Sequence, residues 1–118
     1  MNIIICGAGR VGFTIAKQLS EQGHSITVIA PSSEDIQKID DALDVKAIVG
    51  KATYPSILEK ANASEADMII AVTRNDEINM VICQIAFSIF NIPKKIARIR
   101  SQDYLNPKFT TVYNKENL

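Results

Sequence analysis

The hexapeptide GAGRVG, residues 7–12, directly follows the apolar run NIIIC at residues 2–6. Val11, Ile15 and Leu19 then recur at helical spacing, so the glycines lie between a predicted buried strand and a predicted amphipathic helix. In such a unit the first glycine permits a tight turn, the second lets the backbone approach a pyrophosphate, and the third lets the helix pack against the strand. The stretch predicts a dinucleotide-binding turn, whose candidate binding residues are Gly7, Ala8, Gly9, Arg10, Val11 and Gly12.

The alternative is a tight turn with only a structural role. The predicted helix after the turn favours binding, because free N–H groups and the positive end of the helix dipole would face a phosphate. Arg10 either adds a cation near that phosphate or is a solvated side chain in the first helical turn.

Outward from this turn, predicted strands alternate with predicted helices, and such alternation is typical of a parallel sheet wound on both sides. Apolar runs predict strands at 2–6, 25–30, 46–50, 67–73 and 95–100, and helical periodicity or capping residues predict helices near 10–22, 33–43, 55–61 and 76–90. We expect a single α/β domain, Rossmann-like, over residues 1–106. The polar segment 107–118 is predicted to be a linker or tail towards domains absent from this chain.

Composition excludes several functional classes. Thirteen basic residues balance thirteen acidic ones in the 118-residue chain, so a nucleic-acid-binding surface is not expected. No apolar run reaches the length of a membrane span, and no charged segment precedes the first apolar run, so we expect a soluble, cytosolic protein without direct membrane insertion. Cys6 and Cys83 lie among apolar residues and are predicted to be buried, and one histidine with two distant cysteines cannot form a metal site.

The end of the second predicted strand departs from the dinucleotide-binding pattern. About twenty residues after the glycine turn a carboxylate is expected to accept hydrogen bonds from a ribose, and Ala30 stands at that place. Glu34 and Asp35 belong to the next helix, where complementing the helix dipole and capping are the favoured roles. Ser32 and Ser33 could cap that helix or donate to a ribose or its 2′-phosphate. Losing the ribose contact weakens binding by about 1–3 kcal/mol.

Three further segments leave predicted strands at the carboxyl edge of the sheet, where ligands of this fold class bind. They contribute Lys51, Ala52 and Thr53 after the third strand, Thr73 and Arg74 after the fourth, and Arg98 and Arg100 at the fifth. If 95–100 is a strand, Arg98 and Arg100 share one face, which favours contact with a phosphate or an acidic partner surface. Asp76 either caps its helix or contacts a ligand.

The predicted helix 76–90 is apolar around most of its circumference. One apolar stripe consists of Ile78, Val81, Ile82, Ile85, Ala86 and Ile89. Met80, Cys83, Phe87 and Phe90 extend the apolar arc beyond what one buried face requires. We therefore expect this helix to contact another subunit in a homo-oligomer, a dimer or ring. The alternative is that the segment after Ser101 folds back over it.

Catalytic groups are not evident in the sequence. His24, the single histidine, is predicted at the amino end of the second strand, which is the wrong edge for hydride chemistry. No Ser/His/Asp or Cys/His set can be assembled, so we expect a nucleotide-binding module that is not an enzyme.

Three stretches together resemble the N-terminal nucleotide-binding domain of Trk potassium-uptake regulatory subunits, in the regulator-of-K⁺-conductance (RCK/KTN) family. They are NIIICGAGRVG, the segment from VGKAT to FSIFN, and ARIRSQDYL, in which AVTRNDEINM and ARIRS are the most specific motifs. The resemblance implies a peripheral cytosolic subunit at the inner face of the cell membrane. It also implies binding of NAD(H) or ADP/ATP and control of a membrane potassium-translocating subunit.

By the same resemblance, residues 7–11 would hold the pyrophosphate, Thr73 and Arg74 would lie near the adenosine, and residues 51–53 would line the pocket. Arg98 and Arg100 would approach phosphates or a neighbouring subunit. Ala30 does not match the family's acidic residue, so ADP or ATP becomes more plausible relative to NAD. Further domains follow this one in the family, so the chain is expected to be part of a longer protein.

Two alternatives stay open at this point. The chain could be the cofactor-binding half of an NAD(P)-dependent dehydrogenase, although neither catalytic residues nor a substrate domain are evident. It could also be a structural oligomerisation domain whose pocket binds nothing.

Overall fold

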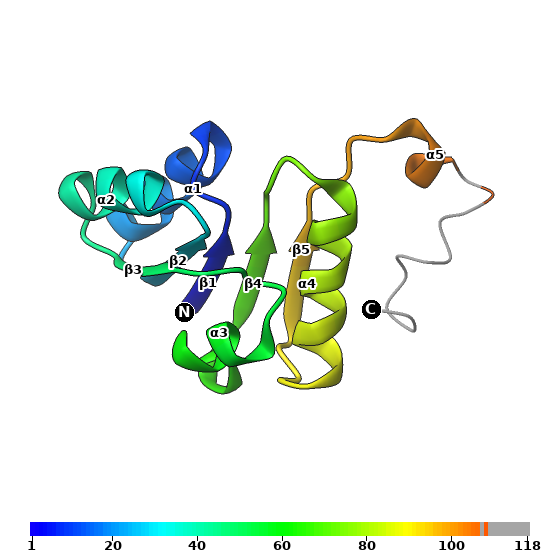
Figure 1. Ribbon diagram of the computed structural model, residues 1–118. Helices are drawn as coiled ribbons and strands as arrows, with labels where there is room; N and C mark the ends of the chain where they lie inside the picture. Colours follow the sequence, from blue (N-terminus) through cyan, green and yellow to red (C-terminus); the bar gives the residue numbers. More distant parts are fainter. Residues whose placement is uncertain (107, 109–118) are drawn as a thin grey trace.

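The computed structural model describes residues 1–106 and Lys108 of the chain. Five parallel strands form one sheet in the order β3-β2-β1-β4-β5, with helices on both faces (Figure 1). The elements are β1 (Asn2–Cys6), α1 (Arg10–Glu21), β2 (Ser25–Ala30), α2 (Ser33–Ala42), β3 (Lys46–Val49), α3 (Pro55–Lys60), the 3₁₀ helix η1 (Ala63–Glu65), β4 (Met68–Ala71), α4 (Asp76–Ser88), β5 (Lys94–Ala97) and α5 (Gln102–Leu105). The predicted doubly wound, Rossmann-like fold is confirmed.

The central strand β1 is buried on both faces because its side chains alternate between two cores. Ile3 and Ile5 pack with Ala16 of α1 and Ile39 of α2 on one face of the sheet. Ile4 and Cys6 belong to the opposite core, together with Leu58 of α3 and Ile82, Cys83 and Ala86 of α4. The chain reaches this second face because the segment after β3 crosses in front of the sheet to α3 (Figure 1). The unbroken apolar run of β1 thus follows from its place between two helical layers.

Both cysteines are buried and free, as predicted. Burial raises the pKa of the Cys6 thiol strongly, and the neighbouring Cys83 raises it further. Burial also raises the pKa of Cys83 to about 11, although the positive charge of Lys95 opposes the shift. Both groups therefore remain protonated thiols at neutral pH and act as small apolar side chains.

β3 ends one residue earlier than the sequence predicts, and β4 and β5 end two and three residues earlier. The predicted strands 67–73 and 95–100 are observed as Met68–Ala71 and Lys94–Ala97, so Arg98 and Arg100 follow β5 and do not share one face of a strand. The physical reason is that α4 side chains take over the backbone hydrogen bonds there. Asn79 bonds to Thr73 and Arg98, and Asp76 bonds to Arg100 and Ser101.

Two short elements were not predicted, namely η1 and α5. The proposed division between residues 1–106 and 107–118 falls where the described part of the chain ends, apart from Lys108. Within residues 1–106 and 108, no helix combines the length and apolarity that a membrane crossing requires.

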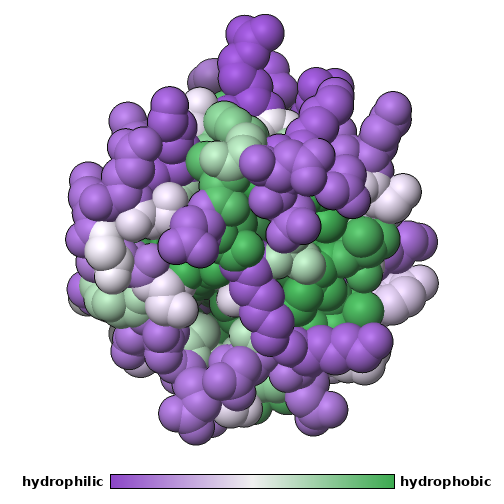
Figure 2. Space-filling view, turned by 90° about the vertical axis from the view of Figure 1, so that its left-hand side faces the viewer, coloured by the Kyte–Doolittle hydropathy of each residue, from purple (hydrophilic) through white to green (hydrophobic). Residues whose placement is uncertain are grey.

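The side of the molecule that carries β3 and α2 is mainly hydrophilic, with apolar surface visible between the hydrophilic side chains (Figure 2). β3 is an edge strand, and its Val49 is 49% exposed. Charged side chains around an edge strand discourage pairing with another chain.

Candidate functional site

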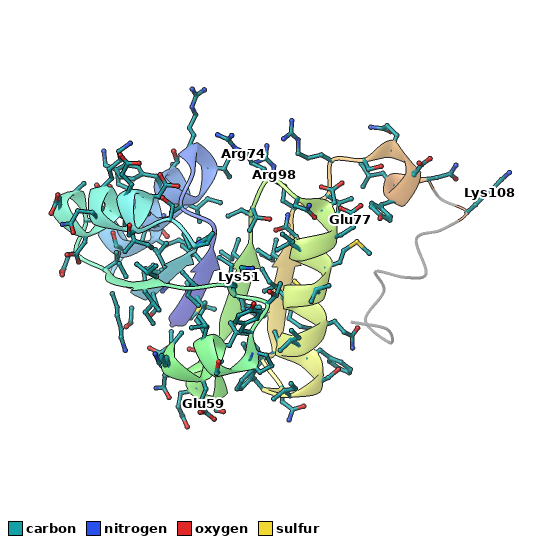
Figure 3. The ribbon with its side chains drawn as sticks, in the orientation of Figure 1. Lys51, Glu59, Arg74, Glu77, Arg98 and Lys108 are labelled. Atoms are coloured by element: carbon teal, nitrogen blue, oxygen red, sulfur yellow. The ribbon has the colours of Figure 1, made fainter. Side chains whose placement is uncertain are left out.

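A cavity of about 870 Å³ lies at the carboxyl ends of the strands, where all five strand exits contribute to its wall. Figure 3 shows Arg74 and Arg98 at this upper edge of the sheet, above β4 and β5, and Lys51 on the segment after β3. Every residue that the sequence singled out for binding lines the cavity except Gly12. These residues are Gly7, Ala8, Gly9, Arg10, Val11, Ala30, Lys51, Ala52, Thr53, Thr73, Arg74, Arg98 and Arg100.

The three glycines of the turn differ in what an added side chain would meet. Gly7 has φ +122°, which side-chain-bearing residues rarely adopt, and a Cβ there would lie 2.9 Å from the Val72 carbonyl oxygen. A Cβ on Gly12 would overlap the Gly7 carbonyl oxygen, so this glycine allows α1 to pack against the turn and faces away from the cavity. A Cβ on Gly9 would meet no protein atom within 4 Å. The fold itself therefore does not require a glycine at position 9.

The space beside Gly9 could hold a phosphate group of a ligand. Gly9 is the N-cap of α1, has no side chain that bonds to the helix, and lines the cavity. The N–H groups of the first helical turn are therefore left for a bound anion. The missing Cβ leaves space at the N-terminus of α1, which fits the close approach of a pyrophosphate.

The exit of β2 is shaped by small and partly exposed residues. Ala30 is 3% exposed and lines the cavity beside Pro31 and Asp35. Ser32 is the N-cap of α2, and its hydroxyl oxygen accepts a hydrogen bond from the Asp35 N–H at 3.2 Å. The capping role predicted for Ser32 or Ser33 therefore falls to Ser32. Asp35, predicted to serve mainly the helix, also belongs to the cavity wall.

The exits of β4 and β5 are joined by the fully buried side chain of Asn79 in α4. Its Oδ1 accepts hydrogen bonds from the Thr73 N–H at 2.9 Å and the Thr73 hydroxyl at 2.7 Å. Its Nδ2 donates to the carbonyl oxygens of Thr73 at 3.2 Å and Arg98 at 2.8 Å. One amide, itself fully buried, thus fixes two cavity-lining segments relative to each other.

Asp76 extends this connection towards α5. Its two carboxylate oxygens accept the N–H groups of Arg100 at 3.0 Å and Ser101 at 2.7 Å. The N-cap of α4 is Asn75, whose side chain accepts from the Ile78 N–H at 2.9 Å, so Asp76 is not the cap that one prediction allowed. Its observed role is to hold the chain between β5 and α5.

The cavity wall is strongly cationic. Arg10, Lys51, Arg74, Arg98 and Arg100 contribute positive charge, and the Lys51 ammonium also lies 5.6 Å from the centroid of the Tyr54 ring. These cations come from the exits of four of the five strands, β1, β3, β4 and β5. A polyanion of a few phosphates is the ligand chemistry that matches this charge.

Sequence reasoning missed the contributions of Pro31, Val72, Ile78 and Ile82 to the cavity wall, and the role of Asn79. A signal for Asn79 was available. It lies on the same side of the helix as the buried Ile82, Cys83 and Ala86, so it interrupts an otherwise apolar face. A polar residue at such a position must find partners.

His24, the single histidine, lies far from the cavity. The Nδ1 atom of His24 lies 3.1 Å from the Met1 amino group, at the opposite edge of the sheet. In the part of the chain that the structure describes, no three His, Cys, Asp or Glu residues gather as a metal site would require.

α4 retains an exposed apolar surface, as the sequence predicts. The predicted stripe is divided between surface and core: Ile78, Val81 and Ile89 are 40%, 46% and 55% exposed, whereas its Ile82 and Ala86 are buried against the sheet. α5 is held at the start of α4, where the Tyr104 hydroxyl donates to Glu77 at 3.0 Å. The alternative, in which the segment after Ser101 folds back over α4, also involves residues beyond those that the structure describes.

Comparison with known proteins decides the family. The sequence model of the TrkA-N domain matches residues 3–112. The chain belongs to the TrkA-N domain family. The glycine turn, the cavity and the motifs AVTRNDEINM and ARIRS of this TrkA-N domain all lie within the matched range.

Curated relatives carry the name Trk system potassium uptake protein TrkA. The protein from Azorhizobium caulinodans is 43% identical over all 118 residues, and that from Haemophilus influenzae is 42% identical over the same length. In both cases the chain spans about a quarter, 26%, of the relative's length. These relatives are named as components of potassium uptake and not as enzymes.

Solved structures share the fold at lower sequence identity. The TrkA-N domain of the inner membrane protein ybaL from Escherichia coli aligns with a TM-score of 0.83 and 22% identity, covering 97% of this chain and 83% of that one. The Kef CTD of Shewanella denitrificans in its AMP-bound form aligns with a TM-score of 0.77 and 24% identity, covering 93% of this chain and 69% of that one. The GsuK channel bound to NAD aligns with a TM-score of 0.69 and 20% identity, covering 79% of this chain and 17% of that one.

Proposed function

We propose that this TrkA-N domain binds NAD(H) or ADP/ATP and thereby regulates a membrane potassium-translocating subunit of a Trk system. The observation that carries the proposal is the cavity at Gly9. A Cβ on Gly9 would meet no protein atom, so the turn leaves space there, and five cations line the cavity. That relatives are named for Trk potassium uptake, and that proteins of the same fold bind AMP or NAD, supports the same proposal.

Residues 7–11 would hold the phosphates through backbone N–H groups at the start of α1. Arg98, Arg100 and Lys51 would supply cations, and Thr73 with Arg74 would lie near the adenosine. A bound nucleotide regulates only by binding two states of an assembly with different affinity. The segment from Arg98 to Ser101, anchored by Asp76 and Asn79, provides a physical connection from the cavity to α5.

Calorimetric titration with NADH, NAD⁺, ADP and ATP tests the binding. We expect saturable binding of at least one of them by the wild-type chain, and at least tenfold weaker binding by Gly9→Ala, because the new methyl group enters the cavity. Lys17→Gln removes an exposed cation of α1 outside the cavity wall and serves as the control that should bind normally. Absence of binding by the folded wild-type chain contradicts the proposal.

The exposed surface of α4 is proposed to be the contact between subunits of a homo-oligomer, a dimer or ring. Val81 and Ile89 project from it. Val81→Lys combined with Ile89→Lys should lower the mass measured by sedimentation, because burying two ammonium groups is costly. Gln84→Lys, at an exposed position of the same helix, is the matched control. An unchanged mass for the double variant would place the contact elsewhere.

The proposed location follows from the proposed partner. A domain that regulates a potassium-translocating subunit would lie in the cytoplasm, peripheral at the inner face of the membrane. Cell fractionation with and without the membrane subunit tests this, and a domain that sediments equally in both cases would argue against it.

A further inference from the structure

The charges of the cavity wall are distributed unevenly. Among the described residues that line it, Asp35 is the single carboxylate, against five cations. The cations come from the start of α1 and from the exits of β3, β4 and β5. The carboxylate stands alone at the β2 exit, beside Ala30 and Pro31. This end of the cavity is therefore suited to a group that donates hydrogen bonds.

The Asp35 side chain is available for such a contact. Residues 32–35 read SSED, a pattern in which the carboxylate often bonds back to the N–H of the cap residue. Here only half of that arrangement forms, since the Ser32 hydroxyl accepts from the Asp35 N–H. Within the described part of the chain, the Asp35 carboxylate has no hydrogen bond or ion pair, and its side chain is partly exposed.

Glu34 is a natural internal comparison. It belongs to the same first turn of α2 and carries the same charge, but it is exposed and does not line the cavity. Stabilisation of the helix dipole would be shared by both residues. Contact with a ligand would be a property of Asp35 alone.

We propose that Asp35 is the carboxylate that binds the ribose hydroxyls of the nucleotide, from the first turn of α2, in place of the residue that Ala30 cannot provide. The proposal rests on the nucleotide-binding function proposed above. A carboxylate accepts hydrogen bonds from vicinal hydroxyls and repels a 2′-phosphate. The negative charge of the neighbouring Glu34 adds to this repulsion. The cavity therefore selects nucleotides with a free ribose and disfavours their 2′-phosphorylated forms.

The test compares pairs of ligands on pairs of variants. ADP and 2′,3′-dideoxy-ADP differ only in the ribose hydroxyls, and NADH and NADPH differ only in the 2′-phosphate. For the wild-type chain we expect ADP to bind about tenfold more tightly than dideoxy-ADP, and NADH about tenfold more tightly than NADPH. In Asp35→Ala the two ligands of each pair, ADP with dideoxy-ADP and NADH with NADPH, should bind with affinities within about twofold of each other. Glu34→Ala should keep the ADP ratio at about tenfold.

A second substitution separates loss of the carboxylate from damage to the helix start. Adding Ala30→Asp to Asp35→Ala restores a carboxylate at the β2 exit and should restore the preference for ADP over dideoxy-ADP. Urea unfolding of each single variant shows whether Asp35→Ala and Glu34→Ala perturb the fold equally.

The outcomes distinguish this inference from the function on which it rests. If the folded wild-type chain binds none of the four ligands, the proposed nucleotide-binding function fails. If it binds ADP, but Asp35→Ala keeps the tenfold ratio, the function stands and the assignment of Asp35 is overturned. If adding Ala30→Asp to Asp35→Ala does not restore the preference for ADP over dideoxy-ADP, that result also counts against a ribose site at the β2 exit.

Discussion

The two halves of the cavity wall are held in different ways. At the exits of β1 and β2 the wall is shaped by glycines and by backbone hydrogen bonds, such as those from the Gly7 N–H to the Ile29 carbonyl and from the Gly50 N–H to the Ala30 carbonyl, both 2.9 Å. At the exits of β4 and β5 the side chains of Asn79 and Asp76 tie the wall together.

This difference determines how each half responds to substitution. The first half depends on glycines, which have no side chain, so it is sensitive to a substitution that adds volume. The second half depends on buried polar atoms that are paired, so it is sensitive to the loss of a partner. The second half is thus preorganised by the protein, whereas the first offers free N–H groups and an unpaired carboxylate for a ligand.

The largest effect is expected within the glycine turn. Gly12→Ala places a methyl group on the Gly7 carbonyl oxygen, which neither backbone segment can avoid, and should lower the free energy of unfolding by about 4 kcal/mol. Gly9→Ala meets no protein atom and should cost less than about 1 kcal/mol, mainly through the altered N-cap. Urea unfolding of both variants measures the difference. Equal losses would show that Gly9 is required by the fold.

Asn79→Leu should have the next largest effect, about 3 kcal/mol in the free energy of unfolding. Leucine has a similar volume, but it leaves the Thr73 N–H and the Arg98 carbonyl without their partner. Gln84→Leu on the exposed side of the same helix is the control and should change stability by less than about 0.5 kcal/mol. If Asn79→Leu is as stable as the control, the network does not hold the second half together.

The two buried thiols, Cys6 and Cys83, predict that the folded protein loses stability at alkaline pH. In the unfolded chain a thiol ionises near its ordinary pKa of 9.0, whereas the pKa of folded Cys83 is about 11 and that of Cys6 is higher still. Since the folded pKa is raised, the stabilisation is complete below pH 9 and is lost as the pH rises towards 11. Each thiol contributes a slope of about 1.4 kcal/mol per pH unit.

Urea unfolding between pH 8 and pH 11 measures this slope for the wild-type chain and for Cys83→Ala. Lysines and tyrosines titrate in both proteins, so the difference isolates the thiol. We expect the variant to lose about 1.4 kcal/mol less per pH unit above pH 9. Identical slopes would show that Cys83 is accessible to water in the folded state.

Asp76→Asn should have the smallest effect, about 1–2 kcal/mol. The new amide can accept from only one of the N–H groups of Arg100 and Ser101 and presents a donor to the other. Glu77→Gln makes the same change of charge one residue later and keeps an acceptor for the Tyr104 hydroxyl, so it is the matched control. Limited proteolysis between Arg98 and Leu105 should become faster in Asp76→Asn alone. Equal rates in both variants would show that charge, and not the bonds to the backbone, holds this segment.

Much of the fold could be predicted from the sequence because its signals are local. The apolar run of β1, the glycine turn and the alternation of strand and helix patterns each lie within a few residues, and they set the order of elements and the edge at which the cavity forms. The Ser32 cap and the burial of both cysteines follow from neighbours in the chain in the same way.

What only the tertiary structure decided depends on residues that are distant in the sequence. The bond from Asn79 to Arg98 spans 19 residues and the bonds from Asp76 to the chain before α5 span 24 and 25, so no local pattern shows where β5 ends or why. The place of Asp35 in the cavity wall depends on how α2 packs beside β2, which its sequence neighbours do not specify. A sequence determines which groups a chain carries and their local conformation, whereas packing over long separations determines which polar groups are paired and which remain available for a ligand.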